Sequence, residues 1–466
     1  MNKRIARLGI VFITAFILLI VNLTYMQFIA SAKLTAKPEN IRPVLYERRI
    51  ERGTIISADG KVLATSRKQD DSYTRVYPEG ELAAHITGFY SSRYGRAGLE
   101  LTYDDYLSGQ SKVSSPDDYM KRLLGEEEPG NDLTLTLDMN LQSIASKALG
   151  LRKGAIVVLD PKTGAVLALV GWPRFDPNTL DDKWKSIAEN PEGALLNRAT
   201  QGRFTPGSSF KIVTAAAAIE SGAVTPATVY EAPAQLKIYG GKVSNYGNKG
   251  FGRISFEEAF IKSVNTVFAQ VGKNLGGQKL VDASEAFGIN GEIPFDLPTA
   301  KSSVPEASEM DDLEVAWMAV GQGRAAVSPL MMALVGAAVA NDGEIMQPYL
   351  VVKASERDGT AVFAREPRPW LCPISKNTAA VLKSLMEQVV AKGTGKSAQI
   401  PGVRVAGKTG TAEVGKGEPH AWFVGFAPVD NPEVIVAVIV ENGGTGGSTA
   451  APIAKQIIAA LLGKNH

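Results

Sequence analysis

An uninterrupted apolar run near the N-terminus is the strongest pattern along the chain. Residues 8–29 read LGIVFITAFILLIVNLTYMQFI and carry no charge, and about 20 such residues are enough to cross a bilayer. Because Lys3, Arg4 and Arg7 precede this run, we expect the N-terminus in the cytoplasm and the rest of the chain outside it. A single transmembrane anchor is therefore predicted. The alternative is a cleaved signal peptide, since ASA at residues 30–32 resembles a cleavage site.

Short alternating segments after the anchor predict a small β-rich module. Residues 52–66 alternate apolar and polar side chains about Asp59-Gly60, which is the pattern of a β-hairpin. Residues 94–109 carry a glycine-rich turn into a short amphipathic segment. Residues 112–132 are polar and punctuated by proline and glycine, so we expect a linker there and a domain boundary near residue 130.

The remainder of the chain alternates helical and strand patterns on a larger scale. Apolar residues at strand spacing flank a turn at Asp160 to Gly164, and three further strand patterns follow late in the chain, separated by short turns. Strands joined in this way pair antiparallel. We expect an α+β fold, in which an antiparallel sheet covered by helices lies against a helical lobe. The expected strands are 132–138, 154–172 (two), 403–414, 421–429 and 433–443, and the expected helices are 138–149, 209–222, 255–276, 331–343 and one from about Ala451.

These patterns together predict four parts. They are a cytoplasmic tail at residues 1–7, an anchor at 8–29, a pedestal module at 30–130 and a large domain at 131–466.

Composition removes several classes of function. With 50 basic and 48 acidic residues the formal charge is only +2, so we expect no nucleic-acid partner. Cys372 is the only cysteine, which excludes an intrachain disulfide and a thiolate metal cluster. The three histidines are scattered, and no Cys/His pair has the spacing of zinc ligands.

The stretch TPGSSFK carries the first candidate chemistry. Residues three apart on a helix share a face, so Ser208 faces Lys211, whereas Ser209 does not. A lysine activates a serine only when it is neutral, and lowering its pKa from about 10.4 to near 7 requires burial and nearby positive charge. The chain holds no other Ser-x-x-Lys, although most such matches in proteins are merely serines at a helix start.

Two further motifs each occur twice. Lys408 to Gly410 lies in a predicted strand, whose edge could hold a carboxylate and half of an oxyanion hole, whereas Lys162 to Gly164 reads as a hairpin turn. Ser263-Val264-Asn265 lies inside a predicted helix, where polar residues either have a function or form an exposed stripe. Ser375 to Asn377 starts a helix, so capping explains it.

The order of these motifs resembles a known family. SSFK, SVN and KTGTAE, at residues 208–211, 263–265 and 408–413, resemble the three motifs of penicillin-binding proteins and serine β-lactamases, and that order excludes the KTG at Lys162. Five flanking blocks resemble class B penicillin-binding proteins in particular, two in their N-terminal module and three in their transpeptidase domain: residues 52–64 and 95–109, and residues 158–170, 321–333 and 421–428.

The resemblance implies a penicillin-binding/β-lactamase-like transpeptidase domain and a role for each motif residue. Ser208 would be acylated by the penultimate D-alanine of a peptidoglycan stem peptide, and also by β-lactam antibiotics. Lys211 would be its base, although the acylation base is disputed in related enzymes. Ser263 and Asn265 would relay protons and hold the peptide amide. Lys408 would supply positive charge near the serines.

The strand after Lys408 would bind the substrate. By the same resemblance, Thr409 would contact the substrate carboxylate, Gly410 would continue the binding strand, and the N–H groups of Ser208 and Thr411 would form the oxyanion hole. A second half-reaction would pass the acyl group to an amine of a neighbouring stem peptide. The resemblance implies no metal and no other cofactor. The cross-link would form outside the cell membrane.

Other functions fit the motifs less well. A β-lactamase would need fast deacylation by water, and the anchor and pedestal argue against it. A third possibility is a β-lactam sensor or a non-catalytic scaffold for wall synthesis, and the intact Ser208, Lys211 and Lys408 argue against it. Because no region resembles a glycosyltransferase, we expect a multi-spanning membrane glycan polymerase as a partner.

Overall fold

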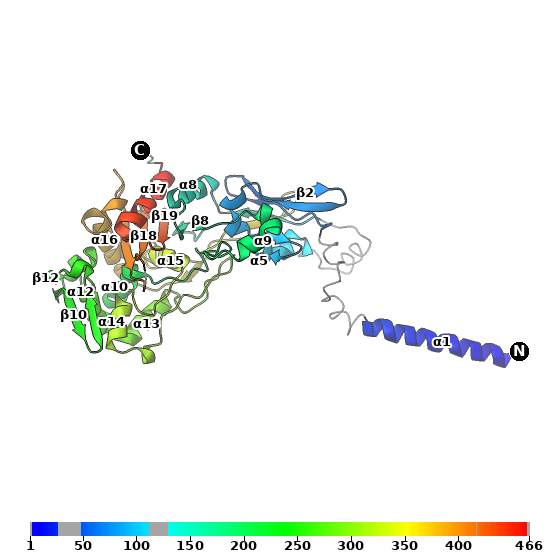
Figure 1. Cartoon of the computed structure of the whole chain (residues 1–466), viewed down its shortest axis with the longest axis horizontal. Coiled ribbons are helices and arrows are strands. Elements are labelled where there is room, and N and C mark those ends of the chain that lie inside the picture. The colour runs from blue at the N-terminus through cyan, green and yellow to red at the C-terminus, as the bar shows by residue number, and fades with distance from the viewer. Residues whose placement is uncertain (1, 27–47, 111–128, 416, 464–466) are drawn as a thin grey trace.

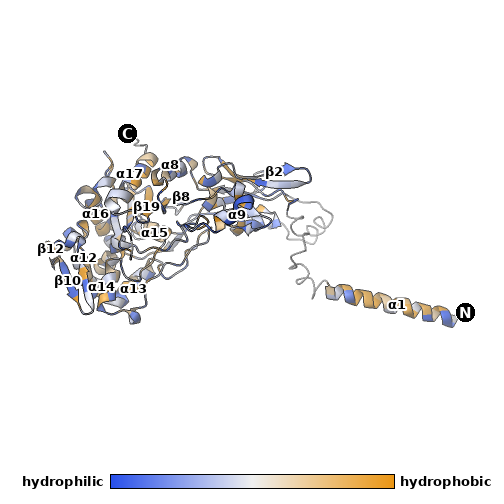
Figure 2. Ribbon diagram, viewed as in Figure 1, coloured by the Kyte–Doolittle hydropathy of each residue, from blue (hydrophilic) through white to orange (hydrophobic). Residues whose placement is uncertain are grey.

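The structure, a computed structural model, describes residues 2–26, 48–110, 129–415 and 417–463 (Figure 1). Helix α1, Asn2–Tyr25, is hydrophobic along most of its length (Figure 2), and its segment Lys3–Tyr25 is long and apolar enough to span a membrane. This helix matches the predicted anchor as far as Tyr25. Residues 27–29 of that anchor and residues 112–128 of the predicted linker lie outside the described residues.

A five-stranded antiparallel sheet forms the centre of the molecule and confirms the predicted hairpins. Its strand order is β17-β18-β19-β7-β8, so the strand that carries the KTG motif of Lys408 lies at an edge. The strands are β7 (Gly154–Leu159), β8 (Val166–Trp172), β17 (Ala406–Ala412), β18 (His420–Ala427) and β19 (Val434–Val440).

Helices cover both faces of this sheet, because its central strands are apolar on both sides. In β19, Val436 and Val438 pack in one core with Ile453 of α17, whereas Ile435 and Ala437 pack in the other core with Leu334 of α15. Alternation along the strand divides the two cores. Helices α8 (Met139–Leu149) and α17 (Ala451–Leu461) lie together on the first face, and α15 (Pro329–Ala340) lies on the second (Figure 1).

A helical lobe adjoins the KTG edge of the sheet. Its helices are α10 (Lys211–Glu220), α11 (Phe256–Ile261), α12 (Asn265–Leu275), α13 (Gly277–Ala286), α14 (Asp312–Ala319) and α16 (Lys376–Lys392). Two small antiparallel pairs lie on the outside of the lobe: β9 (Val229–Ala232) with β12 (Gly252–Ser255), and β10 (Gln235–Ile238) with β11 (Gly241–Ser244).

One predicted helix is broken in two. The sequence predicts a continuous helix over residues 255–276, but α11 ends at Ile261 and α12 begins at Asn265, with Ser263 between them at φ +56°. The carbonyl oxygen of Ser263 accepts a hydrogen bond from Lys211 instead of an intrahelical one. The prediction that Ser263 and Asn265 lie mid-helix is therefore wrong, because a tertiary contact replaces the helical hydrogen bond.

The N-terminal module shares a second sheet with the rest of the chain. The strand order is β15-β14-β6-β1-β2-β3, and β6, which follows residue 130, pairs in parallel with β1 and antiparallel with β14. The strands are β1 (Ile55–Ile56), β2 (Val62–Gln69), β3 (Ser72–Val76), β6 (Asp132–Leu135), β14 (Val351–Ser355) and β15 (Ala361–Ala364). The shorter elements are α4 (Ala84–Thr87), β4 (Tyr90–Ser91), β5 (Gly95–Arg96), α5 (Leu99–Thr102), α6 (Asp104–Leu107), α9 (Leu180–Ala188), β13 (Ile345–Met346) and β16 (Pro369–Leu371).

Hydrogen bonds also tie this module to the segment that precedes Ser208. Asn178 bonds both the N–H and the carbonyl of Tyr77, each at 2.9 Å. The His85 ring nitrogen Nε2 lies 2.8 Å from the carbonyl oxygen of Ala194. Burial lowers the pKa of His85 to about 4, so at neutral pH the ring is uncharged and Nε2 donates its proton. The module and the rest of the chain are thus bonded through main chain as well as side chain.

Candidate active site

Ser208 lies in a tight turn whose backbone is held by close contacts at two glycines. The 3₁₀ turn Gly207–Phe210 runs directly into α10, which starts at Lys211. Gly207 has φ +55°, and a Cβ atom there would lie 2.7 Å from the carbonyl oxygen of Thr411. A Cβ atom at Gly321 would lie 1.9 Å from the Gly207 oxygen. Both positions require glycine, and together they bring Ser208 against β17.

The two adjacent serines differ in what they can do. Ser209 is fully buried, and its hydroxyl donates a hydrogen bond of 2.6 Å to the carbonyl of Pro206. Ser208 is half-buried, and its hydroxyl makes no hydrogen bond with the described residues. Only Ser208 therefore presents an uncommitted hydroxyl to an incoming group.

Lys211 is buried among polar groups of the broken helix. Its Nζ atom donates to Asn265 Oδ1 at 2.7 Å and to the Ser263 carbonyl at 2.8 Å, and lies 3.2 Å from Ser263 Oγ. The Phe268 ring lies 5.2 Å from the same atom. Burial, and then the charge of Lys408, hold the pKa of Lys211 well below its usual range, which favours the neutral amine that a general base requires.

Lys408 approaches the same serine from the sheet. Its Nζ atom donates to Ser263 Oγ at 2.9 Å and to the Thr409 carbonyl at 3.1 Å, and its side chain is fully buried. Burial lowers the pKa of Lys408 to about 7. Lys408 is therefore partly charged and partly neutral at neutral pH, whereas an exposed lysine would be fully charged.

Ser263 and Asn265 connect the two lysines to the surface of the lobe. The hydroxyl of Ser263 accepts from both amines and keeps its own proton for a further partner. Asn265 accepts from Lys211 and donates through Nδ2 to the carbonyl of Ser244 at 2.9 Å, which fixes the orientation of its amide. The structure thus brings together Lys211, Ser263, Asn265 and Lys408.

The KTG strand contacts the Ser208 turn. A Cβ atom at Gly410 would lie 2.9 Å from the Pro206 carbonyl and 3.1 Å from the Ser209 nitrogen, so glycine allows this contact. Gly407, one residue before Lys408, faces the Phe423 ring, which would lie 2.4 Å from a Cβ atom. The group that approaches Gly407 is therefore a neighbouring side chain of the sheet.

Thr409 and Thr411 alternate with Lys408 and Gly410 along β17. Thr411 is half-buried, but Thr409 is only 5% exposed. The hydroxyl of Thr409 lies 2.6 Å from Oγ1 of Thr394. The site residue predicted to contact a carboxylate is thus covered by a residue that sequence reasoning missed.

The duplicate motifs serve as turn and cap, as the sequence predicts. Lys162 to Gly164 forms the turn between β7 and β8, where Asp160 accepts a hydrogen bond of 2.8 Å from the Lys162 N–H and Gly164 has φ +80°. Ser375 caps α16 by accepting from the Thr378 N–H at 3.3 Å. Neither motif contributes to the Lys211 cluster.

The sequence analysis missed two residues near the site, and only one of them carries a signal in the sequence. Thr394 stands in the sequence GTG just before β17, and glycines flanking a threonine signal a close backbone approach. Trp422 donates from Nε1 to the Thr205 carbonyl at 3.0 Å and so holds the chain just before Ser208. No local signal in the sequence marks this role of Trp422.

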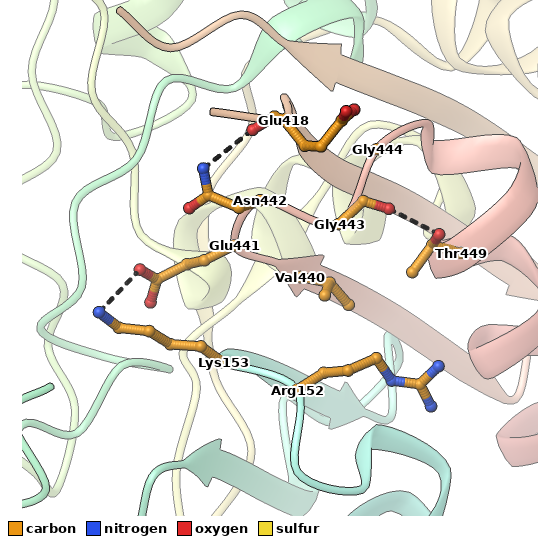
Figure 3. Close-up of a pocket in the computed structure, with 9 residues that line it drawn as sticks. All are labelled: Arg152, Lys153, Glu418, Val440, Glu441, Asn442, Gly443, Gly444 and Thr449. Atoms are coloured by element: carbon orange, nitrogen blue, oxygen red, sulfur yellow. Dashed lines mark hydrogen bonds and ion pairs between the residues drawn. The ribbon is translucent and has the colours of Figure 1, made fainter. Parts of the chain in front are cut away.

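A separate cavity of about 500 Å³ lies at one end of the five-stranded sheet (Figure 3). Glu441 points toward Lys153 at 3.5 Å and also binds Arg198 at 2.8 Å, whereas Arg152 points away to cap α8. The cavity is lined by Arg152, Lys153, Glu418, Val440, Glu441, Asn442, Gly443, Gly444 and Thr449. None of the predicted catalytic residues lines it. Among the described residues, no cluster of histidine, cysteine, aspartate and glutamate could hold a metal ion.

Comparisons with known proteins agree with this geometry. The penicillin-binding protein transpeptidase domain matches residues 154–459, and the penicillin-binding protein A dimerisation domain matches residues 52–133. The chain is 36% identical to the peptidoglycan D,D-transpeptidase PbpA of Mycolicibacterium smegmatis over 99% of both chains. It is 32% identical to the peptidoglycan D,D-transpeptidase MrdA of Acinetobacter baumannii over 82% of this chain and 65% of that one.

Solved structures agree as well. A ceftriaxone acyl-enzyme complex of penicillin-binding protein A from M. tuberculosis superposes with a TM-score of 0.84 at 35% identity, over 90% of this chain and 100% of that one. The D,D-transpeptidase domain of a peptidoglycan glycosyltransferase from Eggerthella lenta gives a TM-score of 0.82 at 38% identity, over 89% of this chain and 99% of that one. The chain therefore belongs to the class B penicillin-binding proteins, the family that its motifs resemble.

Proposed function

We propose that this protein is a serine D,D-transpeptidase that cross-links peptidoglycan stem peptides through an acyl-enzyme on Ser208. The observation that carries the proposal is the convergence of Lys211 and Lys408 on the hydroxyl of Ser263, since Lys211 begins the helix that directly follows the turn holding the uncommitted hydroxyl of Ser208. Burial lowers the pKa of Lys211 and so favours its neutral form, which can accept the proton of a serine nucleophile.

In the first half-reaction, Lys211 takes the proton of Ser208 as Oγ bonds to the carbonyl carbon of the penultimate D-alanine. The oxyanion that forms accepts hydrogen bonds from the N–H groups of Ser208 and Thr411. Ser263 passes a proton, replaced from Lys211, to the departing nitrogen of the terminal D-alanine. The peptide bond breaks, and the stem peptide is left as an ester of Ser208.

In the second half-reaction, an amine of a neighbouring stem peptide attacks this ester. The amine loses a proton to Lys211 through Ser263, the new amide bond forms, and Ser208 recovers its proton as it leaves. Asn265 holds the substrate amide while its own orientation is fixed by Lys211 and Ser244. β-Lactams acylate Ser208 by the first half-reaction alone, since their ring amide opens without losing the leaving group.

The N-terminal helix supports a single-pass membrane anchor. Lys3, Arg4 and Arg7 precede its apolar core, so the proposed orientation has the N-terminus in the cytoplasm and the transpeptidase domain outside. Cross-linking needs glycan strands, whose polymerisation is a different reaction. The proposed partner is therefore a multi-spanning membrane glycan polymerase.

The deciding experiment measures both half-reactions on the purified full-length protein. Labelled penicillin should give one covalent adduct, located on Ser208 by peptide mass spectrometry, with a lifetime of hours; a lifetime of seconds indicates a hydrolase instead. A pentapeptide stem donor with an amine acceptor should then release D-alanine and give a cross-linked product. A long-lived adduct without any cross-linked product would instead indicate a β-lactam sensor.

A further inference from the structure

The outer face of the hairpin β10–β11 carries two lysines side by side. Strand pairing places Lys237 directly opposite Lys242, and both side chains are exposed. Side chains in such positions lie about 5 Å apart at Cβ, and like charges there destabilise a hairpin. Lys242 donates to Gln235 Oε1 at 3.4 Å, and neither lysine forms an ion pair with the described residues. An anion bound at this face would therefore relieve the repulsion between the two lysines.

The sequence around the hairpin is basic. Residues 232–256 contain four basic side chains and no acidic one. Arg253 pairs with Glu231 at 3.4 Å, which leaves Lys249 and the two hairpin lysines without a carboxylate partner among the described residues. The formal charge of the whole chain is only +2, so this excess of positive charge is local. Charge complementarity favours a ligand that carries several anionic groups.

Two exposed tyrosines lie at the two ends of this hairpin. Tyr239 lies in its turn and is 99% exposed, and Tyr246 follows β11 by two residues and is 80% exposed. The strand between them covers three residue steps, or about 10 Å, which is longer than one amino acid. A tyrosine ring offers an apolar face for packing and a hydroxyl for hydrogen bonding. Sugar rings match both features, because they have apolar C–H faces and hydroxyl edges.

The hairpin is held against the lobe, so its outer face is a fixed surface. Ile238 and Val243 point to the opposite side and lie in the core. Asn245 is buried, and its Nδ2 atom donates to the carbonyl of Lys249 at 2.8 Å. This bond closes the short loop that presents Tyr246. Little ordering is therefore needed when a ligand binds to this face.

The same surface is continuous with the catalytic cluster. The carbonyl of Ser244, the last residue of β11, accepts a hydrogen bond of 2.9 Å from Asn265, and Asn265 accepts one of 2.7 Å from Lys211. Only two hydrogen bonds thus separate the hairpin from the proposed base. A long substrate held at the cluster can continue along β10 and β11.

We propose that the outer face of the hairpin β10–β11 binds the glycan strand that carries the stem peptides. Sugar rings pack on Tyr239 and Tyr246, and carboxylates of the attached peptides pair with Lys237 and Lys242. This assignment rests on the proposed function, because such strands are the polymer whose stem peptides are cross-linked. It adds a binding surface outside the three motifs and gives the enzyme a preference for the polymer over a free peptide.

The test compares three substrates on the full-length protein. They are uncross-linked glycan strands with pentapeptide stems, the free pentapeptide with an amine acceptor, and labelled penicillin. A double variant, Lys237→Gln with Lys242→Gln, removes the two charges, Tyr246→Ala removes the ring, and Tyr246→Phe keeps it. The matched control is Lys183→Gln with Lys185→Gln, because both lysines are exposed on α9, which lies far from β10 (Figure 1).

Only the polymer should respond to the hairpin variants. The lysine double variant and Tyr246→Ala should each raise the KM for glycan strands about 3- to 10-fold with kcat unchanged. Rates with the free pentapeptide and with penicillin should change less than about twofold, because neither extends along the hairpin. Tyr246→Phe and the α9 control should match the wild type. Added salt should weaken strand binding more in the wild type than in the lysine double variant.

Several results would overturn the assignment. An equal loss with all three substrates would show a structural defect, and an unchanged KM for glycan strands would show that this face is not used. An equal effect of the α9 control would show general charge attraction. A polyphosphate that competes as well as excess glycan strands, with no effect of Tyr246→Ala, would indicate an unselective anion surface. If the wild-type protein cross-links neither strands nor free peptides, the proposed function itself fails.

Discussion

Lys408 Nζ donates a hydrogen bond of 2.9 Å to Ser263 Oγ across 145 residues of sequence. This contact joins the edge strand of the sheet to the gap between α11 and α12. Lys211 reaches the same side chain from α10, so the position of Ser263 is set by two amines from two different elements. A serine held in this way can pass a proton in either direction with little movement.

The first prediction concerns the nucleophile. Ser208→Ala should abolish covalent labelling by penicillin, because of the two adjacent serines Ser208 alone has an uncommitted hydroxyl, whereas Ser209→Ala should keep most of it. Lys211→Ala should slow acylation by several orders of magnitude and leave the protein folded, since base and nucleophile act as a unit. Gel fluorescence with labelled penicillin measures all three. Full labelling of Ser208→Ala, or a dead Ser209→Ala of normal stability, would show that the wrong serine was chosen.

The second prediction separates the two Ser-x-Asn motifs. Ser263→Ala removes the acceptor shared by both lysines and should slow acylation strongly. Ser375→Ala removes a helix cap and should lower the free energy of unfolding by about 1 kcal/mol with normal acylation. Acylation kinetics and thermal unfolding of the two variants form the comparison. Normal acylation in Ser263→Ala would count decisively against its proposed role.

Much of the fold follows from local sequence patterns, but the break between α11 and α12 could not be predicted from such a pattern. The hairpin β7–β8, the strands β17 to β19 and the caps were predictable because alternation and turn residues act over a few positions. Residues 255–276 have continuous helical spacing, yet the carbonyl of Ser263 bonds Lys211. Periodicity carries no information about a donor 52 residues away, so this gap could not be predicted.

The candidate site divides in the same way. The sequence identified Ser208, Lys211 and the KTG strand because each motif is short and ordered along the chain. It did not identify the cover that Thr394 places over Thr409, because that contact depends on how α16 ends against α11. The assignment of Lys408 as a charged group also missed its full burial, which only packing against the lobe creates.

The third prediction concerns pH and Lys408, whose pKa of about 7 is set by burial. Its charge attracts the substrate and lowers the pKa of Lys211, so the second-order acylation constant should fall as the pH rises through about 7. It should also fall at lower pH, where Lys211 becomes protonated. In Lys408→Met the decrease of the acylation constant above about pH 7 should vanish, because its titrating group is gone. The decrease at low pH should move to higher pH, because the pKa of Lys211 rises without the charge of Lys408. An identical profile in wild type and variant would contradict this account.

The fourth prediction concerns how the titration of Lys408 changes the free energy of unfolding with pH. The folded pKa of Lys408 lies below the ordinary lysine value of 10.5, so between about pH 7 and 10 the unfolded chain binds more protons than the folded one. The free energy of unfolding contributed by Lys408 therefore rises with pH over that window. Denaturant unfolding of wild type and Lys408→Met at several pH values should differ in this slope.

The last prediction concerns the polymerase partner, and the structure determines how to test it. Deleting the pedestal would remove β1, which pairs with β6, and so would damage the sheet that continues into the rest of the chain. Exposed apolar residues of the module are the better target, and they include Val62, which is 37% exposed, and Leu101, which is 50% exposed. Leu151 follows α8, outside the module, and is 77% exposed, so it serves as a matched control. Val62→Glu and Leu101→Glu should weaken co-purification with the polymerase, whereas Leu151→Glu should not.

The membrane helix offers an equally matched pair. The Thr14 hydroxyl bonds the Ile10 carbonyl within α1 at 2.9 Å, so Thr14→Val should be neutral, whereas Asn22→Leu removes a polar side chain that can bond another helix. Replacing Lys3–Tyr25 with an unrelated apolar helix should lose the partner while penicillin labelling stays normal, because Ser208 and Lys211, its proposed base, lie outside this segment. The measurements are the amount of polymerase that co-purifies from detergent and the activity of that polymerase. A free-standing cross-linker becomes the better account if no polymerase co-purifies with the native protein. The same conclusion follows if the polymerase still co-purifies with the helix replacement and with the Val62 and Leu101 variants.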